Sequence, residues 1–218
     1  MTSSTVLVFT RTTGYRHDSI PAGVEAVRAL AADDGLSVDH TEDPSVFTAD
    51  RLRGYRAVVW LSASGNILDE DQRRAFGDWL ASGGTYAGIH AASTAERAWP
   101  EYEQIVGARF TQHPPVQTAT VHVEDAAHPS TTDLPSVWEH TDEWYDFEVN
   151  PRGRVRVLLT VDESTYDGGQ MGQDHPLAWT TELGSGRGWY TALGHGSELY
   201  EDPTFLTHLR GGLRSIWH

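Results

Sequence analysis

The first half of the chain alternates between short apolar runs and longer segments with helical spacing of apolar residues. Strands are predicted at 5–10, 36–43, 57–62 and 85–89, and helices at 18–35 and 68–84. Asp18 or Ser19 can cap the first helix, Pro21 suits its first turn, and Gly35 ends it. This β-α-β-α rhythm predicts an α/β fold with a mainly parallel sheet and helices on both faces.

The second half is richer in strands. Strands are predicted at 116–125 and 154–162, and a Gly-rich turn joins two further strands at 177–183 and 187–195. A final helix over 202–217 is weakened by Gly211 and Gly212. No internal repeat or low-complexity linker interrupts the pattern, so we expect a single domain over residues 1–218.

Composition narrows the class of protein. The chain has 218 residues, 39% of them hydrophobic, which suffices for a substantial core. No apolar stretch is long enough to span a membrane, and the first residues do not resemble a secretory leader, so we expect a cytoplasmic protein. The absence of cysteine excludes disulfides, thiolate metal sites and cysteine nucleophiles.

The formal net charge of −15 and the lack of a basic cluster argue against nucleic acid and anionic membranes as partners. A neutral small molecule such as a sugar is more compatible with this charge. Solubility alone would also account for it. The sequence is compatible with a homo-oligomer as well as with a monomer.

Three of the eleven histidines follow predicted strands. His17 comes after the first strand, His90 directly after 85–89, and His195 directly after "GWYTALG", at the end of the last predicted strand. Ligands of open parallel sheets bind beyond the carboxyl ends of the strands. We therefore expect these histidines to meet at one edge of the sheet, although each alone could be a packed or surface residue.

The segment "GIHAA" predicts a sharp strand-to-helix turn with His90 at its apex. Gly88 and Ala92 flank the apex with small side chains, as such turns require because the strand and helix backbones approach closely. The turn would hold the imidazole in a pocket and strain the His90 backbone. An imidazole held there can act as a general base, a hydrogen-bond donor or a metal ligand.

The segment "HTDEWYDFE" at 140–148 interleaves ionisable and aromatic residues without strand or helix periodicity, which predicts a pocket-lining loop. Glu143 could be a base or an oxygen ligand, and Trp144 and Tyr145 could stack on a sugar ring. A solvated acidic loop is the alternative. His113 and His175 both precede prolines, where turn formation is the alternative to a role in binding.

No local metal-binding motif is present, but a distributed site for zinc or a similar divalent ion would suit the residue types. Its ligands would meet only in the fold. The expected donors are His17, His90, His140, Glu143 and His195.

Six segments, in this order, resemble the ThuA-like (trehalose utilisation) family over nearly the whole chain. They are "FTRTTGYRHDSI", "GGTYAGIHAAS", "AHPSTTDLP", "DEWYDF", "HPLAW" and "GRGWYTALGH". The resemblance implies a flavodoxin-like fold similar to class I glutamine amidotransferases. In that comparison His90 takes the place of the elbow cysteine and His195 that of the catalytic histidine, which implies that amidotransferase chemistry is lost. Glu198 is out of step by one with the usual glutamate.

The resemblance also implies an enzyme of sugar catabolism, a lyase or hydrolase acting on a disaccharide or a 3-keto-glycoside supplied by an oxidoreductase. The expected catalytic residues are His90, His195 and Glu143, and the expected metal ligands are His17, His90, His140 and His195. The expected substrate-binding residues are Arg16, His17, His113, Trp144, Tyr145 and His175. A sugar-binding or sensing module without turnover is the alternative. Esterase chemistry is disfavoured because Ser93 lies three residues beyond the apex.

Overall fold

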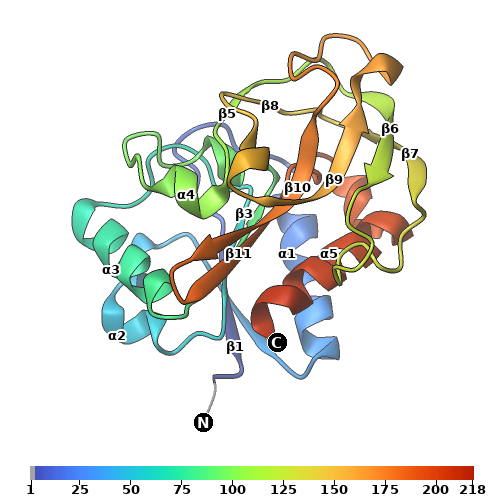
Figure 1. The fold of residues 1–218 in the computed structure, drawn as a ribbon. Coiled ribbons are helices and arrows are strands. Elements are labelled where there is room, and N and C mark those ends of the chain that lie inside the picture. Colours follow the sequence, from blue (N-terminus) through green and yellow to red (C-terminus); the bar gives the residue numbers. More distant parts are fainter. Residues whose placement is uncertain (1–2) are drawn as a thin grey trace.

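The computed structural model describes residues 3–218, and the first two residues of the expected domain lie outside the described part. Its centre is a nine-stranded sheet of order β2-β1-β3-β4-β11-β10-β9-β6-β7 (Figure 1). One half of this sheet runs parallel: β2 (Ser37–Thr41), β1 (Thr5–Phe9), β3 (Val58–Leu61), β4 (Thr85–Ile89) and β11 (Gly186–Thr191). Four of these strands lie within segments that the sequence pattern predicts, and β11 begins one residue earlier than predicted, at Gly186.

The other half of the sheet is antiparallel. It continues through β10 (Pro176–Leu183), β9 (Arg156–Asp162), β6 (Gln117–Val123) and β7 (Val137–Asp142). A small separate sheet pairs β5 (Phe110–Gln112) with β8 (Asp146–Phe147). The predicted loop at 140–148 is therefore partly strand, because His140 and Asp142 belong to β7 and only residues 143–145 link two strands.

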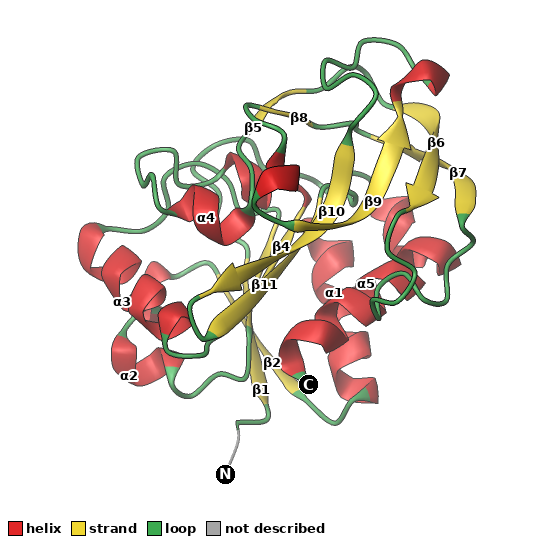
Figure 2. Cartoon of the chain, in the orientation of Figure 1, coloured by secondary structure: helices red, strands yellow, loops and turns green. Residues whose placement is uncertain are grey.

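Helices cover both faces, so the expected α/β fold is confirmed (Figure 2). On one face α1 (Ile20–Asp33) and α5 (Pro203–Trp217) lie together, and α5 packs on β4 and β11. On the other face lie α2 (Ala49–Leu52), α3 (Glu70–Ala81) and α4 (Tyr102–Val106). No helix within residues 3–218 combines the length and apolarity needed to cross a membrane.

The two glycines of α5 are required by close packing. A Cβ atom on Gly212 would lie 2.2 Å from the Trp189 ring of β11, and one on Gly211 would lie 1.9 Å from the Pro129 carbonyl oxygen. The expected weakness of the C-terminal helix is therefore compensated, because the missing side chains let α5 reach the sheet.

Candidate functional site

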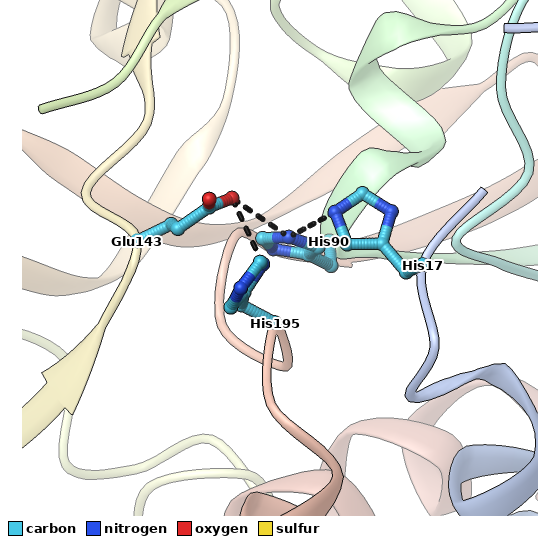
Figure 3. A group of neighbouring side chains, drawn as sticks. All are labelled: His17, His90, Glu143 and His195. Carbon is cyan, nitrogen blue, oxygen red and sulfur yellow. Dashed lines mark hydrogen bonds and ion pairs between the residues drawn. The ribbon is translucent and has the colours of Figure 1, made fainter. Parts of the chain in front are cut away.

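The three strand-end histidines meet at the carboxyl edge of the parallel strands (Figure 3). His17 follows β1, His90 directly follows β4, and His195 lies four residues after the end of β11. The ring centroid of His17 is 4.6 Å from that of His90 and 5.3 Å from that of His195. The His90 and His195 centroids are 5.5 Å apart. The expected convergence of these three side chains is thus present in the structure.

The turn at His90 has the strained backbone that the sequence predicts. His90 has a φ of +51°, in the left-handed region that favours glycine, and begins a short 3₁₀ turn ending at Thr94. At Gly88 a Cβ would lie 2.6 Å from the Tyr86 hydroxyl and 3.2 Å from the Ala92 Cβ. Only small residues therefore fit at Gly88 and Ala92, on either side of the apex. The turn places the His90 imidazole at the carboxyl end of β4.

Hydrogen bonding fixes the tautomer of His90. Its Nδ1 lies 2.6 Å from the Ala192 carbonyl oxygen, which can only accept, so Nδ1 carries a proton. In the neutral ring Nε2 then presents a lone pair. This atom lies 2.9 Å from the Tyr145 hydroxyl, which donates to it, and 3.1 Å from His17 Nε2. His90 is therefore a buried acceptor facing the other site residues.

Glu143 enters the group from the antiparallel half of the sheet. Its Oε2 lies 3.0 Å from His195 Nδ1, outside hydrogen-bond alignment, and 3.5 Å from His90 Nε2. Asp142 supports this arrangement, although no pattern in the sequence indicates a role for it. Its carboxylate accepts from the backbone N–H groups of Gly194, His195 and Glu143 at 2.8, 3.1 and 2.9 Å. Asp142 thus ties the end of β7 to the loop after β11.

The pKa values of three members of the group, His17, Glu143 and His195, are shifted in different ways by their surroundings. Burial, assisted by the neighbouring His90 and His195, lowers the pKa of His17 to about 3, so His17 is neutral at pH 7. Burial alone would raise the pKa of Glu143, but the contacts with His195 and His90 outweigh it and hold that pKa well below its usual range. The Glu143 carboxylate in turn raises the pKa of His195. Glu143 is anionic, and it favours the charged form of the His195 imidazole.

The same four residues fit a divalent cation. One ligand atom from each of His17, His90, Glu143 and His195 lies within 4.8 Å of all the others. The Nδ1 atom of His195, which faces Glu143, is buried without a hydrogen-bond partner, and His17 turns its Nε2 toward His90. Three imidazoles and a carboxylate suit zinc and similar ions, and an Nδ1–H bond to a carbonyl like that of His90 is how ligating histidines are oriented.

A cavity of about 460 Å³ opens beside this group: His17 and Glu143 line it, and His90 and His195 lie behind these two residues. His17, Glu143 and Tyr145 line its floor, and His113 lines its wall with Nε2 3.3 Å from Glu143 Oε1. Its other lining residues are Gly14, Tyr15, Ser64, Gly65, Ala91, Thr94 and Phe110. Of the expected binding residues, the structure brings His17, His113 and Tyr145 to this cavity.

Trp144 and Arg16 are placed elsewhere, which corrects the expectation that they bind substrate. Trp144 is fully buried, and its Nε1 donates to the Gln117 carbonyl, because it points into the core on the side of its chain opposite Tyr145. Arg16 is half exposed, and its guanidinium bonds to Glu42 at 2.8 Å. Neither side chain lines the cavity.

His140 and His175 also lie outside the cavity. His140 packs between Trp144 and Phe205 with Nε2 3.7 Å from Asp142 Oδ2, so it is not a member of the candidate metal group. His175 lies behind Tyr145, where its Nε2 donates to the Tyr145 carbonyl at 2.9 Å. The expected direct roles of both in metal or substrate binding are therefore corrected.

A second group of ionisable residues lies around His175. It consists of His175 itself with Asp146 and Glu163. His175 Nδ1 lies 2.8 Å from Glu163 Oε1. Both carboxylates already accept backbone N–H groups, Glu163 from Met171 and Gly172 and Asp146 from Gln170. The group therefore supports the Tyr145 backbone from behind.

The fold and site define an α/β protein with a histidine-rich pocket at the carboxyl edge of its parallel strands. The family profile described as trehalose utilisation matches residues 5–216. The chain therefore belongs to the ThuA family.

Solved structures agree with this assignment. A ThuA-like protein of Bacteroides uniformis is 25% identical with a TM-score of 0.84, covering 97% of this chain and 90% of its own. A ThuA-like protein of Parabacteroides merdae is 23% identical with a TM-score of 0.81, covering 99% and 90%. The cytoplasmic protein STM1381 of Salmonella typhimurium shares the fold at 14% identity and a TM-score of 0.66, covering 97% and 99%. A comparison with curated protein sequences gives no significant match.

Proposed function

We propose that this protein is an enzyme of sugar catabolism that acts on a glycoside or 3-keto-glycoside by acid–base chemistry at the cavity floor. The observation that carries the proposal is the convergence of His17, His90, His195 and Glu143 beside a cavity of about 460 Å³. Pockets of this size accept small molecules. The family description, trehalose utilisation, supports a sugar as the substrate.

The chemistry of a 3-keto-glycoside suits these residues. A keto group at C3 acidifies the proton on C2, so a base can remove it and expel the substituent on C1. The C2–H and C1–O bonds break, a C1–C2 double bond forms, and the departing oxygen takes up a proton. Such an elimination needs a base, a proton donor and a group that stabilises the enolate oxygen.

The chain can provide a base and a group that stabilises the enolate in its cation-free form, and the proton that the base removes from C2 is then available to the departing oxygen. His90 Nε2, with its tautomer fixed by the Ala192 carbonyl, is the base. His195, whose charged form Glu143 favours, can donate to the keto oxygen as negative charge develops there. No cysteine exists in the chain to form the thioester of a glutamine amidotransferase, and an imidazole at the elbow apex cannot replace it.

We also propose that a divalent cation such as zinc occupies this site. His17, His90, His195 and Glu143 would hold it. When bound it would supply Lewis-acid polarisation of a carbonyl oxygen. His90 and His195 would then be ligands, and the Tyr145 hydroxyl and the His113 ring would be titratable groups of the lining that remain to face the substrate.

The proposal is tested by incubating purified protein with a 3-keto-disaccharide and following its disappearance, before and after chelator treatment and metal restoration. Turnover is expected, and Glu143→Gln should reduce it by roughly 100-fold, the usual scale for an acid–base group. Glutamine should not be hydrolysed. Tight sugar binding without turnover under every metal condition would overturn the proposal in favour of a binding or sensing module.

A further inference from the structure

The outer part of the cavity has an aromatic wall that the proposed chemistry does not use. Tyr15 stands at the rim with 70% of its surface exposed, and Phe110 and Tyr145 lie deeper on the cavity lining. Phe110 and Tyr145 pack against each other with ring centroids 4.3 Å apart. Tyr15 is the exposed aromatic side chain of the lining, at the point where a bound molecule would emerge.

The backbone beneath Tyr15 is held firmly. Ser64 Oγ donates to the Tyr15 carbonyl at 2.6 Å, and the Tyr15 ring meets the His17 ring edge-on with centroids 4.8 Å apart. The loops after β1 and β3 pack backbone to backbone here, since a Cβ on Gly65 would lie 2.6 Å from the Gly14 nitrogen. The exposed ring is therefore presented on a fixed base, as a binding platform requires.

The charge of the lining selects a neutral ligand. Within residues 3–218, no arginine or lysine side chain lines the cavity. The nearest guanidinium in sequence, that of Arg16, is bonded to Glu42. A phosphate on the outer ring would therefore meet no guanidinium or ammonium group on the cavity lining, and it would lose part of its hydration without gaining a charge partner.

We infer that Tyr15 is the platform of an outer subsite, and that the ligand is a neutral glycoside of two rings. One ring lies on the histidine floor, and the second, the leaving-group ring, stacks its apolar face on Tyr15. Aromatic rings bury apolar faces while leaving polar edges free to hydrogen-bond, which suits a sugar ring at a cavity mouth. The placement of the first ring rests on the proposed function.

The test compares a 3-keto-disaccharide with methyl 3-keto-glucoside, which lacks the second ring. Tyr15→Ala should lower the ratio of kcat/KM for the two-ring over the one-ring substrate about tenfold, mostly through KM. Tyr15→Phe, which keeps the ring, should preserve the ratio, as should Val149→Ala, an exposed apolar control outside the cavity. A general disturbance of His17 would slow both substrates equally, leave the ratio unchanged and overturn the subsite.

Direct binding separates the subsite from the proposed function. Calorimetric titration with trehalose is expected to show weaker binding to the Tyr15→Ala protein than to the wild type, even if neither protein turns over a keto-glycoside. That pair of results would support the subsite while contradicting the proposed function. Turnover of the disaccharide with an unchanged ratio in Tyr15→Ala would do the reverse. Tighter binding of trehalose 6-phosphate than of trehalose would overturn the neutral-ligand part.

Discussion

The Nδ1 atom of His90 donates to the carbonyl oxygen of Ala192 over 2.6 Å, joining the ends of the neighbouring parallel strands β4 and β11. This one bond decides which ring nitrogen faces the cavity floor. It leaves Nε2 as an acceptor toward Tyr145 and His17. The orientation of the His90 ring is therefore set by a main-chain carbonyl group. Replacing His90 should change both the chemistry of the site and the link between the ends of β4 and β11.

Replacing His90 is expected to abolish turnover and also to affect stability. His90→Ala should reduce turnover roughly 100-fold or more. The side chain is fully buried and hydrogen-bonded, so its removal should also lower the free energy of unfolding. Alanine at a φ of +51° retains the backbone strain and loses the hydrogen bonds.

His90→Asn is the matched variant, because asparagine tolerates the left-handed conformation better than alanine does. It should unfold at higher urea concentration than His90→Ala while remaining equally inactive in the keto-disaccharide assay. Full activity in either protein would remove this histidine from the mechanism.

Metal binding should raise the thermal stability of the protein. Protein dialysed against chelator and then given zinc at about 100 times its dissociation constant should gain about 2.7 kcal/mol, a Tm rise of roughly 5–10 °C. Elemental analysis should then find one ion per chain. His17→Ala should lose most of the Tm rise, because it removes a member of the ligand group.

His140→Gln is the control for this experiment, since His140 lies on β7 outside the ligand group. It should retain both the ion and the Tm rise. Equal loss of metal in the two variants would place the ion elsewhere, and absence of any Tm rise with zinc, manganese or cobalt would contradict the site itself.

Stability should fall as the pH drops below 6.5 because of His208. Burial, together with the nearby His128 and His140, lowers the pKa of His208 to about 4 in the folded protein. The unfolded chain binds the proton near pH 6.5 and the folded protein does not, so the stability present above 6.5 is lost progressively down to about pH 4.

Between pH 7 and pH 5 this group alone should cost about 2 kcal/mol of unfolding free energy. Urea unfolding of the wild type and of His208→Gln at both pH values measures the effect. The difference in unfolding free energy between pH 7 and pH 5 should be smaller by about 2 kcal/mol in the His208→Gln protein than in the wild type. An identical pH dependence in both proteins would exclude His208 as its source.

Gly212 should be irreplaceable despite its place in a helix. Alanine is favoured over glycine in a helix interior by about 1 kcal/mol. At this position its Cβ would lie 2.2 Å from the Trp189 ring, so Gly212→Ala should destabilise the protein by roughly 1–3 kcal/mol or more. Gly153→Ala, which meets no atom within 4 Å, should be close to neutral. Thermal unfolding of the two proteins makes the comparison, and a stabilised Gly212→Ala protein would show that α5 can move away from the sheet.

The sequence alone determined the parallel half of the fold and the histidines at its edge. Strands β1, β3 and β4 are continuous apolar runs, and α1 and α3 carry their apolar residues at helical spacing. Parallel strands place their carboxyl ends at one edge, so the order of the chain was enough to bring His17, His90 and His195 together.

Only the tertiary structure decided which residues of the 140–148 segment join them. Glu143 and Tyr145 reach the cavity, whereas His140 and Trp144 are packed away from it. Local sequence does not contain this information, because it depends on the register of β7 against β6 and on the bonds from Asp142 to the loop after β11. In an extended chain successive side chains point to opposite sides, so a pairing shifted by one residue would exchange the buried and cavity-facing sets.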